Sequence, residues 1–140
     1  MITFDDLANL ASEWPDLITN VDLVSGPGAL LRTARSLFTH SWFDYEFMSV
    51  ACLVGFQAME AAFRELYPDA GRRPFRHLVR RALDEGILSP TIADLAETAV
   101  ELRNLSAHPR TQTALTVGLA TSMLENTHRL VALVVAATQS

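Results

Sequence analysis

The chain has 140 residues, of which 49% are apolar and only six each are glycine and proline. The length suits one domain with its own core, and the apolar content excludes a disordered chain. The low glycine and proline content favours helices over a turn-rich β-protein. The net charge is −5, and because the chain has no lysine all eleven positive charges are arginine. Any contact with nucleic acid must therefore depend on a local basic surface. We expect a single domain over residues 1–140.

The N-terminus and the apolar segments indicate a cytoplasmic protein with no membrane partner. Residues 1–6 are acidic and do not resemble a signal peptide. The longest apolar runs, residues 47–59 and 130–137, are too short to span a bilayer. Cys52, the only cysteine, lies in the first of these runs, so we expect a buried free thiol.

Two helices are predicted in the first 40 residues. Thr3 is a predicted N-cap, with acidic residues in the first turn, and this helix ends before Pro15. Glycine and proline then predict a break at residues 25–28. Apolar residues at helical spacing predict a second helix over residues 30–38.

Residues 42–66 are predicted to form one long helix, because apolar residues lie almost all round its axis. Such a helix lies in the middle of a core or in a subunit interface. The aromatic residues at its start are expected to be core residues rather than a surface on which bases stack. They are Trp42, Phe43, Tyr45 and Phe47.

Three further helices are predicted in the second half of the chain. Residues 75–85 give a short amphipathic helix. Ser89 and Pro90 are a predicted N-cap and first helical residue, and this helix must end near residue 107 because a proline follows at position 109. The last helix runs from about residue 111 to 137. We therefore expect an all-α fold, a compact bundle of five to six helices around a long central apolar helix.

The sequence contains three copies of one pattern, an arginine followed five residues later by a histidine. With eleven arginines and four histidines, chance predicts about 0.3 matches at one fixed spacing, so the spacing alone identifies nothing. The matches are Arg35–His40, Arg72–His77 and Arg103–His108. Only the third has an asparagine after its arginine, and only the third lies at a predicted helix end shortly before the last helix.

The segment from Glu101 to Pro109 resembles the defining motif of the HEPN superfamily, an arginine and a polar residue followed by a histidine after a short spacer. Residues 37–47, which lead into the long apolar helix, also resemble bacterial HEPN-like proteins. The resemblance implies a HEPN-like helical fold and a metal-independent endoribonuclease that works as a homodimer without a cofactor. Its catalytic residues would be Arg103, Asn104 and His108. On residue physics alone, the segment is a helix C-terminus with a cation near it.

The chemistry that the resemblance implies fits these residue types. RNA carries its own nucleophile, the 2′-hydroxyl, so cleavage needs a base, an acid and positive charge over the phosphate. Two copies of His108 could divide the base and acid roles, and Arg103 would supply the charge. Asn104 could orient either neighbour. In HEPN toxins silenced by nucleotidylation, a tyrosine stands two residues after the histidine. Arg110 occupies that position here, so this mode of control by an antitoxin is not expected, and Arg110 could instead contact RNA.

Glu60 and Arg64 resemble an accessory pattern of HEPN domains, a glutamate and a basic residue four apart. Their other interpretation is an ordinary salt bridge along one helix. The only dense group of cations lies between positions 72 and 81. Its members Arg73, Arg76 and Arg80 could bind an RNA backbone or an acidic partner, or could form a solvated face that pairs with the surplus acids.

Two functions therefore stay open after the sequence alone. The first is a HEPN ribonuclease, a toxin or defence effector with an RNA substrate and an antitoxin partner. The second is a non-catalytic HEPN-like helical dimer that serves binding or assembly. The four histidines have no close pair at metal-ligand spacing, and no phosphate-binding glycine loop is present, so we expect neither a metal nor a nucleotide cofactor.

Overall fold

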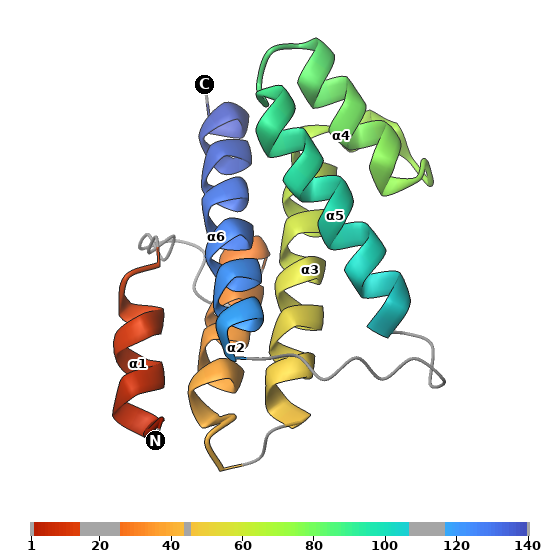
Figure 1. Cartoon of the computed structure of the whole chain (residues 1–140). Helices are drawn as coiled ribbons and strands as arrows, with labels where there is room; N and C mark the ends of the chain where they lie inside the picture. The colour runs from red at the N-terminus through yellow and green to blue at the C-terminus, as the bar shows by residue number, and fades with distance from the viewer. Residues whose placement is uncertain (1, 15–25, 44–45, 107–116, 140) are drawn as a thin grey trace.

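The computed structural model describes residues 2–14, 26–43, 46–106 and 117–139, and for residues 102–106 it describes the helix but not the side chains. Within these ranges the chain forms six α-helices and one short 3-10 helix, and no strand (Figure 1). The elements are α1 (Phe4–Ser12), α2 (Pro27–His40), α3 (Glu46–Leu66), η1 (Pro68–Ala70), α4 (Phe75–Asp84), α5 (Pro90–Ser106) and α6 (Val117–Gln139). The predicted all-α bundle is confirmed.

The predicted start of the first helix is also confirmed. The Thr3 hydroxyl accepts a hydrogen bond from the Asp6 amide at 3.2 Å, and the Asp6 carboxylate accepts one from the Thr3 amide at 2.8 Å. This reciprocal pair satisfies two amides that would otherwise lack acceptors. The break before the second helix falls at Gly26, whose φ of 86° suits glycine, and Pro27 opens α2.

The long central helix begins later than predicted. Residues 41–43 form a turn, and α3 starts at Glu46 rather than at residue 42. The prediction that the aromatic residues here are core residues is wrong for Trp42, Phe43 and Phe47, which are 49%, 67% and 37% exposed. Trp42 instead donates its indole N–H to the Ile2 carbonyl at 3.2 Å. Tyr45 lies outside the described residues.

The bundle is organised around α3, which packs against α2 and α6 along most of its length. In Figure 1, α1 (red) lies on one side of these three helices, and α4 and α5 (green and teal) lie on the other. The predicted long central apolar helix is therefore confirmed. By length and composition α3 is also the one described helix that could cross a membrane, and half of its most apolar window is buried against the other helices.

The buried residues form two clusters that share α2, α3 and α6. One cluster joins the start of α2 and the second half of α3 to η1, α4, α5 and the end of α6, and Phe56, Phe63 and Phe75 make edge-to-face contacts in it. The other joins α1, α2 and the first halves of α3 and α6, around Trp14 and Phe38. The three helices that contribute to both clusters join the two halves of the core.

Gly55 of α3 faces Leu124 and Thr127 of α6 at a close approach of the two helices. A methyl group at this position would lie 3.0 Å from Cδ2 of Leu124 and 3.6 Å from Cγ2 of Thr127. We expect Gly55→Ala to be close to neutral, because the helix propensity of alanine, about 1 kcal/mol better than glycine, offsets a contact that the tip of Leu124 can relieve. Gly55→Leu should lower the free energy of unfolding by about 2 kcal/mol or more, because the extra side chain would separate the helices. Urea unfolding of both variants measures this, and equal stability of the two would contradict the close approach.

Candidate functional site

The predicted catalytic residues belong to the end of α5 and to the segment after it. The start of α5 is fixed by Ser89, whose hydroxyl accepts a hydrogen bond from the Ile92 amide at 3.3 Å, as predicted. Arg103 and Asn104 lie in the last turn of the helix, which is described as far as Ser106. Their side chains, together with His108 and Arg110, lie outside the described residues, so the contacts among these four residues stay a prediction.

The first competing copy of the motif is occupied by structural contacts. Arg35 donates a hydrogen bond to the Trp14 carbonyl at 3.3 Å, and its guanidinium lies 6.0 Å from the centre of the Trp14 ring. His40 contacts the Phe4 ring edge-on at 5.6 Å and binds the Ser36 carbonyl through Nδ1 at 2.8 Å. These two side chains hold opposite ends of α1 and do not converge.

The second competing copy spans a loop and a helix start. Arg72 lies in the turn after η1, and His77 lies in the first turn of α4. Both residues are exposed. Neither residue has a described partner that would orient it towards the other, so nothing in the described structure makes this pair a site.

The accessory pair Glu60 and Arg64 forms a salt bridge at 3.2 Å along one face of α3. Arg64 also donates hydrogen bonds to the Gly71 carbonyl at 3.0 Å and the Arg73 carbonyl at 3.2 Å. Its guanidinium therefore fixes the loop between η1 and α4. This geometry fits the interpretation of Glu60 and Arg64 as a structural pair better than an accessory catalytic role.

The arginines around α4 divide into two groups. Arg81 belongs to a network: it donates to Glu85 at 3.0 Å and to Asp69 at 3.0 and 3.2 Å, and it covers the Tyr67 ring at 4.1 Å. The hydrogen bond from Arg81 lowers the pKa of Asp69. Burial, together with the neighbouring Glu85 carboxylate, raises the pKa of Tyr67 to about 12. This network is structural, and the sequence analysis did not foresee it.

The other arginines of this group face solvent. Arg73 and Arg80 are exposed. Arg76 is exposed too, and only a long contact of 3.9 Å joins it to Glu101. Together these three side chains form a basic face on and beside α4. Since α5 follows α4 and packs against it, the basic face and Arg103 belong to neighbouring helices.

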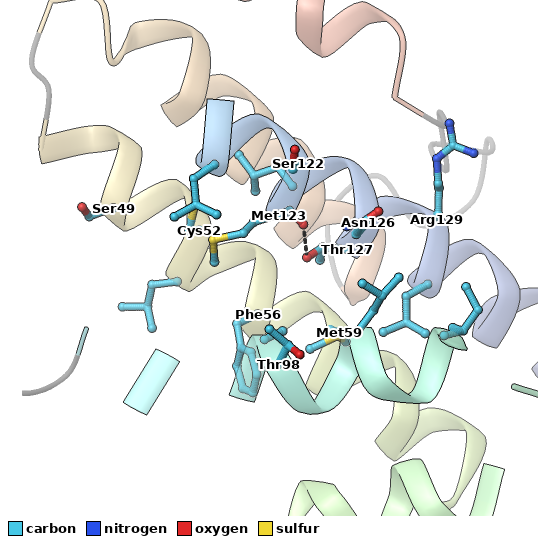
Figure 2. Close-up of a pocket in the computed structure, with 17 residues that line it drawn as sticks. Ser49, Cys52, Phe56, Met59, Thr98, Ser122, Met123, Asn126, Thr127 and Arg129 are labelled. Carbon is cyan, nitrogen blue, oxygen red and sulfur yellow. Dashed lines mark hydrogen bonds between the residues drawn. The ribbon is translucent and has the colours of Figure 1, made fainter. Parts of the chain in front are cut away.

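An apolar groove of about 210 Å³, which the sequence did not indicate, lies between α3, α5 and α6 (Figure 2). The Thr98 hydroxyl in its wall donates to the Asp94 carbonyl at 2.9 Å, and the Thr127 hydroxyl donates to the Met123 carbonyl at 2.7 Å. Because both hydroxyls bond within their own helices, the wall that they share with Met59 and Phe56 is effectively apolar. Leu53, Leu95 and Leu119 are exposed and belong to the same lining.

Cys52 lies in this groove beside Met123 (Figure 2). Its thiol is free, as predicted, but the residue is half-buried rather than fully buried. Burial of the sulfur raises the pKa of the thiol to about 12. Such a thiol is a poor nucleophile, so Cys52 is no candidate for covalent catalysis.

His128 is a second feature that the sequence did not single out. It is 1% exposed, its Nδ1 lies 2.6 Å from the Leu124 carbonyl, and its ring lies 5.0 Å from that of Trp14. Burial lowers its pKa to about 4, and the Arg35 charge acts in the same direction. His128 is therefore a neutral core residue near pH 7.

No group of three or more histidine, cysteine, aspartate or glutamate residues suited to a metal ion occurs in the described parts of the chain. Comparisons of the chain with protein-family models, curated proteins and solved structures found no match.

Proposed function

We propose that the chain is a metal-independent endoribonuclease of the HEPN type, whose site is completed by two protomers. The observation that carries the proposal is the position of Arg103 and Asn104 in the last turn of α5, close in sequence to His108. Of the three copies of the motif, this one alone has an asparagine after its arginine and lies at the end of a helix shortly before the last helix, whereas Arg35 and His40 of the first copy contact the two ends of α1. The helical bundle, with one more long helix after the motif, also agrees with the resemblance.

The proposed reaction needs only groups that the chain supplies. One His108 imidazole takes the proton of the 2′-hydroxyl, which then attacks the adjacent phosphorus. The second protomer's copy of the same residue protonates the departing 5′-oxygen, so that the products are a 2′,3′-cyclic phosphate and a free 5′-hydroxyl. Arg103 neutralises charge that builds up on the phosphate, and Asn104 orients one of these groups.

Binding of RNA to an acidic chain requires a local positive surface. The solvent-facing arginines Arg73, Arg76 and Arg80 supply such a surface beside α5. Arg110, two residues after His108, would add a further positive charge. An enzyme of this kind suits a toxin or defence effector in the cytoplasm, and the protein that restrains it would be an antitoxin. Glu60 and Arg64 have no part in this proposal beyond fixing the loop that carries Arg73.

The test is cleavage of a labelled RNA by purified protein in the presence of EDTA. Wild-type protein should yield fragments with 2′,3′-cyclic phosphate ends, and His108→Ala should yield none. His40→Ala is the matched control, because His40 is an exposed histidine from a competing copy of the motif and should leave cleavage unchanged. Equal cleavage by wild type and His108→Ala, or cleavage that EDTA abolishes, would contradict the proposal.

A second candidate function is a binding or assembly module without nuclease activity. The observation that favours it is the apolar groove between α3, α5 and α6, whose edge carries the exposed residues Leu53, Leu95 and Leu119. If the wild-type protein forms a dimer but cleaves none of several RNAs, the result would favour a binding or assembly module over a ribonuclease.

A further inference from the structure

Exposed apolar side chains gather on one part of the bundle. Phe47, Val50 and Leu53 follow each other at intervals of three residues along α3 and are 37%, 43% and 44% exposed. Residues at this spacing are neighbours on a helix surface. Leu53 also lines the α3–α5–α6 groove, whose other exposed lining residues are Leu95 and Leu119, at 40% and 39%. We call these five residues the apolar strip.

The exposed area of the apolar strip is close to the apolar area that one partner contributes to a protein interface of standard size. At roughly 150–200 Å² for a large apolar residue, the exposed parts of the five side chains amount to about 350 Å². One partner in an interface of standard size contributes about 800 Å², of which a little over half, about 450 Å², is apolar. The strip supplies most of this area, and the inner wall of the groove can supply the rest.

The strip combines a projection with a hollow. Phe47 and Val50 project from the first half of α3, and the groove of about 210 Å³ opens beyond Leu53 on the same helix. The groove is lined mainly by apolar side chains, and the hydroxyls of Thr98 and Thr127 are bonded within their own helices, so most of its wall suits an apolar side chain. The other polar residues of the lining are Ser49, Ser122, Asn126 and Arg129. In a two-fold symmetric pair, the projecting side chains of each copy can enter the groove of the other, so that the same surface is used on both copies.

We infer that the apolar strip is the contact between two copies of this chain, with Phe47 of each protomer seated in the groove of the other. The inference rests on this surface and not on the ribonuclease proposal. It does bear on that proposal, because the end of α5 and the first turn of α6 lie at the same end of the bundle as the first half of α3 (Figure 1).

Sedimentation equilibrium of the full chain tests the contact. Wild type should be a dimer in the micromolar range, and a Val50→Glu, Leu53→Glu double variant should raise the dissociation constant more than about a hundredfold, because two charges from each protomer would be buried. Leu133→Glu is the matched control, since Leu133 is also 44% exposed but lies on α6 outside the groove lining, and it should stay dimeric. All three proteins should keep the same helical circular dichroism. A monomeric wild type, or a double variant that remains dimeric, would overturn the inference.

The single cysteine allows a test of the register. In a Phe47→Cys variant, the introduced thiol and Cys52 of the same chain lie five residues apart on one helix, about 140° round the axis, so they cannot form an intramolecular bond. If residue 47 enters the partner's groove, mild oxidation should give a covalent dimer that a thiol reductant reverses. The Phe47→Cys, Cys52→Ser variant should give no such dimer. Equal crosslinking by both variants would mean that the two introduced thiols meet each other, which would overturn the proposed register.

The outcomes separate this inference from the proposed function. A wild-type dimer that cleaves no RNA would support the dimer contact and contradict the ribonuclease proposal. A monomer that cleaves RNA would contradict the dimer contact and the shared site, but not the ribonuclease activity.

Discussion

For a chain that cleaves RNA by the proposed mechanism, Arg103→Ala is expected to slow cleavage by a factor of about 100–1,000, because it would remove one group that stabilises charge in the transition state. The loss should appear in the maximal rate more than in the affinity for RNA, since the guanidinium acts on charge that develops during the reaction. The fold should be unaffected. A cation in the last turn of a helix contributes only about 0.3–1 kcal/mol to stability, and Arg103 lies in the last turn of α5.

The control for this prediction is Arg32→Ala, because Arg32 is an exposed arginine in the middle of α2. It should leave both the rate and the free energy of unfolding unchanged. Single-turnover cleavage, with protein in excess over labelled RNA, separates the chemical step from binding. If Arg103→Ala only weakened binding and left the rate at saturation intact, Arg103 would be an RNA-binding residue and not a catalytic one.

The second large effect concerns His128 and acid. Its pKa is about 4 in the folded chain, whereas a histidine in an unfolded chain titrates near 6.5. Between pH 6.5 and pH 4 His128 is therefore protonated in the unfolded state but mostly neutral in the folded state. The free energy of unfolding falls across this range as the pH is lowered. The difference corresponds to about 3 kcal/mol, which is a large part of the stability of a domain of this size.

The cause of this effect lies in the surroundings of the imidazole. Nδ1 faces the Leu124 carbonyl, so the neutral ring carries its hydrogen there, and Nε2 is buried without a hydrogen-bond partner in the described structure. A proton on Nε2 would create a buried donor with no described acceptor, close to the Arg35 charge.

Urea unfolding between pH 7 and pH 4 measures the prediction, with His128→Leu as the comparison. Other groups also titrate in this range, so the informative quantity is the difference between the two proteins. The wild type should lose about 3 kcal/mol more than the variant between these limits. Parallel pH dependence of wild type and His128→Leu would show that this residue does not set the acid limit.

Local signals in the sequence predicted the starts of α1, α2 and α5 well, because each of these starts depends on a few neighbouring residues. Thr3 with Asp6, and Ser89 with Pro90, satisfy the first amides of their helices wherever those helices pack. The glycine-proline break before α2 was found for the same reason.

Features that depend on which helices pack together could not be predicted from local signals. An apolar composition does not indicate which side of α3 another helix covers. Trp42, Phe43 and Phe47 were therefore expected in the core, whereas in the structure they are exposed. The partners of Arg81 come from η1, from the preceding turn and from the end of α4, and only folding joins them. The groove needs three helices that are remote in sequence. Of the candidate site, the position of Arg103 and Asn104 near a helix end was predicted, whereas their contacts with His108 stay a prediction.

The sharing of α2, α3 and α6 between the two buried clusters has a consequence for how the bundle unfolds. Neither cluster can dissolve without exposing apolar residues on a helix that also belongs to the other cluster. Partial unfolding of one half would therefore leave three helices with newly exposed apolar residues, which is an unfavourable intermediate. The described helices should behave as one cooperative unit, with matching midpoints from tryptophan fluorescence, which reports on Trp14 and Trp42 beside the two ends of α1, and from circular dichroism, which reports on the whole chain.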